Sequence, residues 1–532
     1  MIAGASRQAA AIAAALTLLA GAGASAQTLG DRPSEQDLFG GGAKPAPAPA
    51  SGAPPAAGVA PAAAPPAPAS ADAKPNEPPA ASTEGTSRDQ DILGKGEEAK
   101  FLSDFVAPEN PLQIGGQLYL RAQTTASAHQ NPGDWSLSAP SLLDLYLDAR
   151  PNPRVRAFIL GRMAYDPTLV PNDAPNTAGA DTNGALAGTT TPTGFSTFSS
   201  KRGPTSLLDQ MWIRFDILQK VFVTTGKQHV HFGTGRFWQP TDYLHPVKRN
   251  PLDVFDARGG VTMIKVNVPW EAQGWNFSAF GVTEDPNVET NTLGKVAGAA
   301  RAEVVLAGVE LGADIFAHKG ERPRYGFDFS TGIWDFDVYG EMALRPGGDF
   351  LHYDPELMTV GTYTGYETQI VGGINYSRKY NDNDAWTVGA EYFYNHPGYS
   401  SASVYPQALQ YAVANPNVVP NPFVLFPFFY LGQHYGALFA SFPAPYSWNY
   451  TTFTISTLGN LTDKSFISRV DYSVTVLTHL SVEAFVGVHY GHVGGEFRFE
   501  LPSSTAAQLG ATSGVLGSYP IVDMGAALRI KI

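Results

Sequence analysis

The stretch from 207 to 268 constrains the fold most, because apolar and charged side chains alternate along it. In its first segment Trp212, Arg214 and Asp216 separate four apolar residues: Met211, Ile213, Phe215 and Ile217. Successive side chains of a β-strand point to opposite faces, so this segment predicts a sheet with one apolar and one charged face. A turn of three residues leads to the next strand, and a long loop leads to the third. Short and long connections in alternation are typical of a closed antiparallel barrel that spans a membrane.

The first 26 residues have the composition of an export signal. Arg7 supplies a positive charge, the residues through Ala22 are mostly apolar, and Ala24-Ser25-Ala26 offers a small-residue cleavage site. We therefore expect residues 1–26 to be a signal peptide. The absence of cysteine excludes a lipid anchor and disulfides. No later apolar run reaches about 18 residues, which excludes helical membrane spans.

Residues 27–108 have a composition that cannot form a folded core. Between 43 and 81, 29 of 39 residues are Ala or Pro, and so many prolines favour extended polyproline II segments. We expect this Ala/Pro-rich region to be a disordered linker in the periplasm. A cell-wall-spanning or partner-binding arm is the alternative.

Residues 109–532 continue the strand pattern to the last residue, without a change of composition that would mark a second domain. We therefore expect an all-β fold over this region, a transmembrane antiparallel up-and-down β-barrel. Only 16% of the whole chain is charged and its net charge is −13, which argues against a nucleic-acid partner.

Counting strands by alternation predicts a defined topology. Seventeen segments are evident: 112–124, 142–150, 154–165, 207–217, 221–233, 260–268, 275–282, 296–306, 309–317, 325–331, 334–345, 368–377, 385–394, 448–458, 466–477, 480–490 and 521–532. Single-chain bacterial barrels have an even number of strands. A hidden strand at 434–442, followed by a turn at 443–447, restores parity. We therefore predict 18 strands, with 16 as the fallback.

This count places every short connection on the periplasmic side of the barrel and every long one outside. Tryptophans near the predicted strand ends fit the aromatic girdles of membrane interfaces: Trp270, Trp275, Trp334, Trp386 and Trp448.

Several short segments resemble a group of bacterial porin-like outer-membrane proteins. They are residues 226–233 (Gly-Lys-Gln-His-Val-His-Phe-Gly), 240–242 (Pro-Thr-Asp), 250–252 (Asn-Pro-Leu) and 459–465 (Gly-Asn-Leu-Thr-Asp-Lys-Ser). Uncharacterised porins and alginate-export-type channels carry a similar strand and Pro-x-Asp loop, although Phe232 stands where they usually have Trp. The resemblance implies a porin, that is, a water-filled channel for passive diffusion of small polar or charged solutes.

Residues 234–258 form the third long loop of the predicted barrel. In general porins this loop folds inward and narrows the channel. We expect a constriction loop whose charged and aromatic side chains set ion selectivity: Arg236, Trp238, Asp242, His245, Lys248 and Arg249. The alternative is an ordinary surface loop packed by its aromatic residues.

His229 and His231 lie two residues apart, which places them on one face of the predicted strand. Asp242 and His245 follow closely in the sequence. Imidazole and carboxylate groups are common metal ligands. Because no third ligand stands at a fixed spacing, a hydrated pore wall fits the pattern equally, and we predict no metal site and no cofactor.

Inward-pointing charges divide the predicted barrel into two arcs. Strands one to six carry basic residues, opposed there only by Asp144, Asp148 and Asp216: Arg121, Arg150, Arg154, Arg156, Arg162, Arg214, Lys227 and Lys265. Strands eight to thirteen carry Arg301 and Arg345 but mainly acidic residues: Glu303, Glu310, Asp314, Asp328, Asp335, Asp337, Glu341 and Glu391. The arcs face each other in an 18-strand ring, so we predict a transverse field that orients a passing solute. The alternative is that each charge hydrates the lumen or pairs with a neighbour.

The sequence does not predict an enzyme, because it contains no Gly-x-Ser-x-Gly elbow, His-Glu-x-x-His motif or phosphate loop. A non-transporting adhesin or structural barrel and, with less support, a barrel enzyme are the alternatives. We expect the protein in the outer membrane of a Gram-negative bacterium, in contact with lipid and lipopolysaccharide after insertion by the barrel-assembly machinery. Small polar solutes are the expected partners, and the pattern is compatible with a homo-oligomer.

Overall fold

A computed structural model gives the fold of the chain. It describes residues 111–168, 204–245, 248–252, 258–283, 296–347, 351–363, 365–380, 384–419, 425, 427–446, 448–500 and 518–532, and the backbone of 189–190 and 196–197. All of these residues belong to one compact unit, Glu35–Ile532. The predicted signal peptide and linker, residues 1–108, lie outside the described residues.

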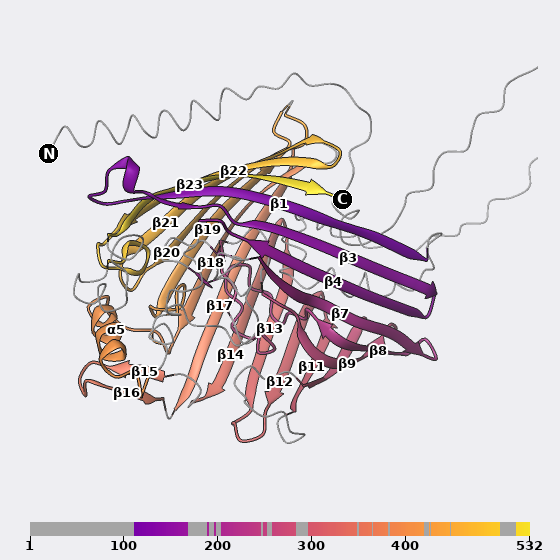
Figure 1. The fold of residues 1–532 in the computed structure, drawn as a ribbon. Coiled ribbons are helices and arrows are strands. Elements are labelled where there is room, and N and C mark those ends of the chain that lie inside the picture. Colours follow the sequence, from indigo (N-terminus) through magenta and orange to yellow (C-terminus); the bar gives the residue numbers. More distant parts are fainter. Residues whose placement is uncertain are drawn as a thin grey trace, which may run out of the picture. The chain divides into compact units, whose positions relative to one another are not determined.

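The described strands form a closed antiparallel barrel in which sequential strands are neighbours (Figure 1). Its strands are β1 (Leu112–Ser127), β3 (Ser141–Asn152), β4 (Val155–Tyr165), β7 (Thr205–Ile217), β8 (Val221–Gln228), β9 (Val261–Trp270), β10 (Trp275–Val282), β11 (Ala297–Leu306), β12 (Val309–Ala317), β13 (Arg324–Ile333), β14 (Phe336–Pro346), β17 (Tyr366–Lys379), β18 (Ala385–Asn395), β19 (His434–Pro443), β20 (Thr451–Asn460), β21 (Ser465–Leu477), β22 (Leu480–Gly491) and β23 (Pro520–Lys531). Pairing of β1 with β23 closes the ring. The predicted fold class and the count of 18 strands are confirmed.

The predicted hidden strand is β19, which pairs with β18 on one side and β20 on the other. The prediction was wrong at two strand starts, because Trp334 and Trp448 lie in turns before β14 and β20. Trp334 has a φ of 56°, a left-handed conformation that a strand residue does not adopt.

The end of β8 also differs from the prediction. This strand stops at Gln228, so His229 and His231 lie in the connection that follows rather than on the strand. The reason is a tertiary contact with β7. The Asp209 carboxylate contacts His229 Nε2 at 2.9 Å and accepts a hydrogen bond from the Gly260 backbone N–H at 3.2 Å. These contacts replace strand pairing where the chain turns away from the sheet.

Short connections gather at one end of the barrel, which we call the turn end. The β11–β12 hairpin has only Ala307 and Gly308 between its strands, and both have positive φ, 52° and 81°. Two successive residues of this kind match the right-handed twist of paired strands. Most connections at the other end, the loop end, are long.

The connections at the loop end contain further secondary structure. It comprises η1 (Pro132–Asp134), β2 (Ser136–Ser138), the pair β5 (Thr189–Thr190) and β6 (Ser196–Thr197), the hairpin β15 (Leu351–Asp354) and β16 (Thr359–Thr362), α5 (Val404–Ala414) and η4 (Glu496–Arg498). No α-helix among the described residues is both long and apolar enough to cross a bilayer.

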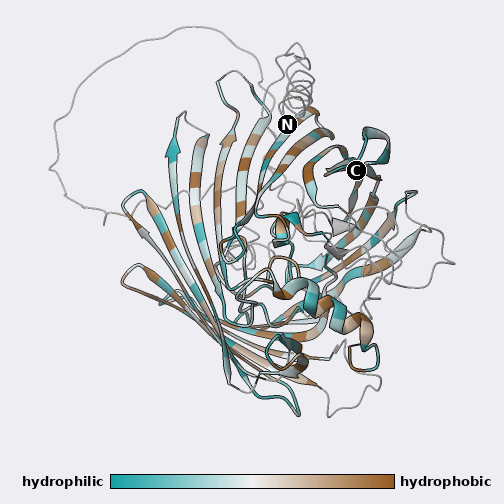
Figure 2. Cartoon of the chain, turned by 90° about the vertical axis from the view of Figure 1, so that its left-hand side faces the viewer, coloured by the Kyte–Doolittle hydropathy of each residue, from teal (hydrophilic) through white to brown (hydrophobic). Residues whose placement is uncertain are grey.

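The two faces of the barrel wall differ in chemistry, as the alternation predicts. On β12, Leu311 and Ile315 are exposed on the outside, whereas Asp314 is buried inside. The same change of hydropathy repeats along neighbouring strands (Figure 2). Large aromatic side chains are exposed near the turn end: Trp270, Trp334, Tyr446 and Trp448.

Candidate pore constriction

The connection between β8 and β9, residues 229–260, is called the inner loop here because its described residues, 229–245, 248–252 and 258–260, lie inside the barrel. Most of its described side chains are buried, and Trp238 and Thr241 have no exposed surface. Its hydrogen bonds reach inward-facing residues of β14, β18 and β21. In the ring of strands β8 and β19 are opposite each other, so these contacts carry the inner loop across the lumen.

Glu391 on β18 holds one part of the inner loop by its backbone. The carboxylate accepts hydrogen bonds from Tyr339 Oη at 2.8 Å and from three backbone N–H groups: Arg236 at 2.6 Å, Phe237 at 3.0 Å and Trp238 at 3.0 Å. A carboxylate removed from water is costly unless its oxygens are hydrogen-bonded. These bonds satisfy Glu391 and fix the position of the loop.

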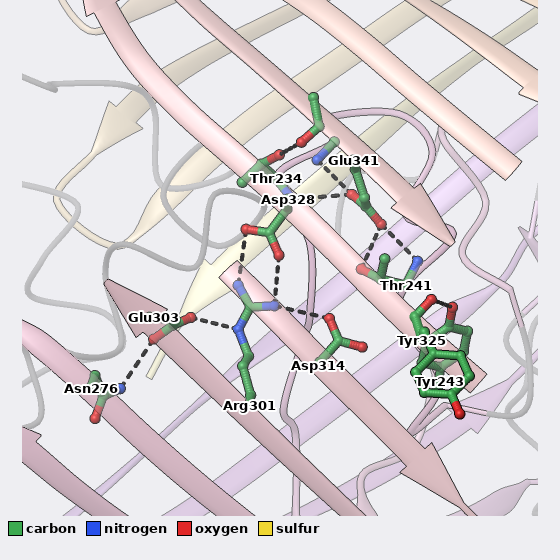
Figure 3. A network of polar contacts seen from close by, with 12 residues as sticks. Thr234, Thr241, Tyr243, Asn276, Arg301, Glu303, Asp314, Tyr325, Asp328 and Glu341 are labelled. Carbon is green, nitrogen blue, oxygen red and sulfur yellow. Dashed lines mark hydrogen bonds and ion pairs between the residues drawn. The ribbon is translucent and has the colours of Figure 1, made fainter. Parts of the chain in front are cut away.

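Glu341 on β14 holds the adjacent part of the inner loop in the same way. One carboxylate oxygen accepts the backbone N–H groups of Thr234 and Gly235 at 3.1 Å each, and the other accepts Thr241 N and Oγ1 at 2.7 Å each (Figure 3). The approach depends on Gly233, whose φ is 94°. A Cβ there would lie 2.3 Å from the Glu341 carboxylate, so only glycine fits.

Aromatic packing reinforces the contact between the inner loop and the wall. The Trp238 ring stacks on Phe393 of β18, with centroids 5.4 Å apart and planes 18° apart. Its indole N–H donates to the Phe429 carbonyl at 3.1 Å. The Arg236 guanidinium lies 3.5 Å from the centroid of the Phe439 ring on β19. The predicted constriction residues Arg236 and Trp238 therefore lie where the loop meets the wall.

Three histidines and Asp242 form a compact group in the inner loop. The rings of His229, His231 and His245 are stacked, with centroids 5.1 to 6.1 Å apart and planes within 24° of one another. Burial lowers the pKa of His245 to about 4, so its imidazole is neutral at pH 7 and its Nδ1–H donates to Asp242 at 3.0 Å. Burial opposes ionisation of Asp242, but His245 and the Arg258 guanidinium, 2.9 Å away, outweigh it and hold the Asp242 pKa well below its usual range.

Lys248 and Arg249, also predicted constriction residues, are half-buried in the inner loop. The Lys248 Nζ is shielded from solvent and has no hydrogen-bond partner. Burial, reinforced by the positive charge of Arg345, lowers the pKa of Lys248 well below its ordinary value. Two further acidic residues of this segment, Asp253 and Asp256, lie outside the described residues.

Several predicted basic residues pair with carboxylates of their own wall. Arg150 and Arg156 share Asp148, each at 2.9 Å, and Arg162 binds Asp144 at 2.8 Å. All five side chains are almost completely buried. Within this group, charges therefore pair with their neighbours.

The remaining predicted basic residues differ in exposure. Arg154 binds Asp216 at 2.9 Å near the turn end, but 54% of its side chain is exposed. The charged groups of three others lie over aromatic rings. Their distances to the ring centroids are 4.8 Å for Arg121 on Phe485, 5.0 Å for Arg214 on Trp212 and 5.8 Å for Lys265 on Phe280. Lys227 is half-buried on β8.

Arg301 organises much of the acidic wall. Its guanidinium binds Asp328 at 2.7 Å, Glu303 at 2.6 Å and Asp314 at 3.3 Å (Figure 3). Glu310 accepts a hydrogen bond from Ser330 at 3.0 Å.

Of two other predicted pore-lining acids, Asp335 lies in a turn, whereas Asp337 is on the same inner face of β14 as Glu341. Asp335 is exposed in the β13–β14 turn, and Asp337 is exposed at the beginning of β14. Both are at the turn end, because Trp334 and Asp335 form the hairpin turn and the strand starts only at Phe336.

A third anchoring carboxylate, Glu496, was not among the residues predicted from the sequence. Glu496 in η4 is fully buried and accepts hydrogen bonds from Tyr435 Oη at 2.7 Å, Asn460 Nδ2 at 2.9 Å and the backbone N–H of Phe429. Burial, reinforced by Asp463, raises the pKa of Glu496 to about 8. We call these residues the loop-end cluster, which ties the β18–β19 connection to the β22–β23 connection. The 459–465 motif marked one part of it in the sequence.

Comparisons with known proteins give structural similarity only. Neither protein-family models nor curated protein sequences match the chain. Acinetobacter baumannii OccAB1 is similar over 79% of this chain and 96% of its own, at 10% identity and a TM-score of 0.45. Pseudomonas putida OprB is similar over 82% of this chain and 97% of its own, at 9% identity and a TM-score of 0.39. A triple mutant of Rhodopseudomonas blastica porin is similar over 79% of this chain and 100% of its own, at 10% identity and a TM-score of 0.36. Scores this low do not establish a common fold, so the architecture rests on the strand pairing alone.

Proposed function

We propose that this porin-like barrel is an outer-membrane channel through which small polar or charged solutes diffuse passively. The observation that carries the proposal is the closed ring of strands with apolar residues outside and charged residues inside. Closure leaves no unpaired strand edge, which the hydrocarbon of a bilayer could not satisfy. The exposed aromatic side chains at the turn end match a membrane interface.

The inner loop is the element that narrows this channel. An 18-strand ring is wide enough for an aqueous passage, and Glu341 and Glu391 hold the loop against β14 and β18. The remaining passage follows the opposite wall, formed by β1, β3, β4 and β7. On the inner face of that wall, apart from the Arg154–Asp216 pair, five arginines outnumber three buried carboxylates: Arg121, Arg150, Arg156, Arg162 and Arg214 against Asp144, Asp148 and Asp209. A positive charge therefore remains after the ion pairs are counted, and we expect the channel to favour anions.

A second candidate is a barrel that does not transport, such as an adhesin or a structural protein. The observation in its favour is an apolar cluster inside the barrel, to which the inner loop and the β18–β19 and β22–β23 connections contribute: Phe237, Trp238, Leu252, Phe429, Tyr430 and Phe497. We propose no catalytic role.

Reconstitution into planar bilayers separates the two candidates. The channel proposal expects stable single-channel steps and, in a salt gradient, a reversal potential of the sign that anion selectivity gives. Folded protein that inserts but remains silent would contradict the channel and favour the second candidate. Heat-modifiable migration of the recovered protein shows that it is folded, and co-sedimentation with lipid vesicles shows that it inserts.

A further inference from the structure

We propose that His231, Asp242 and His245 of the inner loop bind a divalent transition-metal ion such as Zn²⁺. One potential ligand atom from each residue lies within 4.8 Å of the other two. Two imidazoles and a carboxylate form a donor set that Zn²⁺ uses, with a fourth position left for another ligand. The site depends on the geometry of the inner loop and not on the transport function.

The distances in the site suit coordination. Tetrahedral Zn²⁺ with bonds of about 2.1 Å separates its ligand atoms by roughly 3.4 Å. His245 Nδ1 lies 3.0 Å from one oxygen of Asp242, and His231 Nδ1 lies 3.9 Å from the other. The two separations involve different oxygens of Asp242 and lie on either side of the required value, and the ligand atoms of the two histidines lie within 4.8 Å of each other. Side-chain movements of about 1 Å bring the three groups onto one ion.

Hydrogen bonding within the site also points to an ion. His231 Nδ1 is buried, and because 3.9 Å is too long for a hydrogen bond, it has no partner. Buried polar atoms without partners are uncommon in native proteins, and a bound ion is one reason for them. His245 Nε2 is also buried without a partner. When the His245 proton moves from Nδ1 to Nε2, Nδ1 becomes free to bind the metal. Only the hydrogen bond from Nδ1 to Asp242 is lost, and the metal–nitrogen bond replaces that hydrogen bond.

A neighbouring histidine restrains the imidazole rings of His231 and His245. His229 stacks on His231 and His245, and its own Nε2 is held by Asp209 at 2.9 Å. Stacking on a ring that is itself held by a carboxylate restrains the orientation of His231 and His245.

Positive charge close to the site sets a condition on the bound state. Arg258 contacts Asp242 at 2.9 Å, and the shielded amine of Lys248 is buried in the same loop. A bound dication therefore keeps an anion, chloride or hydroxide, in its remaining position, because buried positive charge must be balanced.

Zn²⁺ binding is measured on the full-length, tag-free protein in detergent by calorimetric titration and by metal analysis after dialysis. We expect one Zn²⁺ per chain. His231→Ala and His245→Ala should each weaken binding by at least about 100-fold, since even residues that only support ligands change affinity by 10- to 100-fold. The matched control His318→Ala, which removes a histidine bound to Glu321 in the β12–β13 connection, should bind like wild type. Co²⁺ should give the visible absorption of a tetrahedral site in wild type and in the control only.

Two results would overturn the proposal. One is wild-type protein that binds no stoichiometric Zn²⁺, and the other is equal affinity in the His231→Ala and His318→Ala variants. Heat-modifiable migration shows whether each variant is folded, and His245→Gln replaces the alanine variant if that one is not. Because binding is measured without a bilayer, a silent channel leaves this test unaffected.

Discussion

The two inner walls of the barrel satisfy their charges in different ways. On β3 and β4, Arg150, Arg156 and Arg162 bind carboxylates of the same wall, side chain to side chain. On β14 and β18, Glu341 and Glu391 bind backbone N–H groups of the inner loop. The first arrangement belongs to the wall alone, whereas the second holds a separate element in place. The sign of an inward charge therefore does not reveal its role, which depends on the partner.

Removing both loop anchors should produce the largest effect. In a Glu341→Ala, Glu391→Ala variant, the buried N–H groups of the inner loop lose their acceptors, at about 1–3 kcal/mol each. We expect the inner loop to leave the wall while the barrel stays closed. Limited proteolysis should then cut within 229–260, and heat-modifiable migration should persist. Glu310→Ala, which removes one bond to Ser330, is the control; a loop equally resistant in both variants would refute the anchoring role.

Breaking an ion pair of the opposite wall should weaken the barrel without releasing the loop. Asp148→Asn leaves the buried cations Arg150 and Arg156 without their shared carboxylate, which should cost about 3–5 kcal/mol of the free energy of unfolding. Denaturant unfolding of the folded protein measures this loss. The control Asp335→Asn, at an exposed position, should change the free energy of unfolding by less than about 0.5 kcal/mol. Similar values for the two variants would mean that the wall pairs are not structural.

The basic wall should also influence selectivity. Replacing Arg121 and Arg214, which lie over Phe485 and Trp212, together by Gln should shift the reversal potential toward cations while Asp144 and Asp148 keep their arginines. The shift should be larger at low salt, because charges are screened over roughly 8–10 Å at physiological ionic strength. Identical reversal potentials for variant and wild type at both salt concentrations would remove the proposed role of this wall.

The last expected effect is a pH dependence at the loop-end cluster. The pKa of Glu496 is raised to about 8 in the fold, above about 4.3 for an unfolded glutamate, so the folded state binds the proton more tightly. The stabilisation of the folded state by the Glu496 proton is therefore complete below about pH 4.3 and is lost as the pH rises through 8. Wild-type thermal stability should therefore fall relative to Glu496→Gln between about pH 5 and pH 9. A constant difference in melting temperature between wild type and Glu496→Gln across this pH range would contradict the raised pKa.

The sequence predicts the sheet well, because alternation and an even strand number are requirements of a closed barrel. They are sufficient to locate β19 and to place Glu341 and Glu391 on the inner face. The anchoring role of these two residues could not be predicted, because their partners are mainly backbone N–H groups about 100 residues or more away. Backbone amides are present at nearly every residue and give no sequence signal. Glu496 was missed for a related reason, since its partners come from separate connections and strands.

Single-channel conductance of the Glu341→Ala, Glu391→Ala variant, compared with wild type and Glu310→Ala, tests the central claim most directly. If these carboxylates hold a constriction in an open channel, the double variant conducts more than wild type in each single-channel step, and the control matches wild type. A folded double variant with unchanged conductance would contradict the claim that the inner loop narrows the passage.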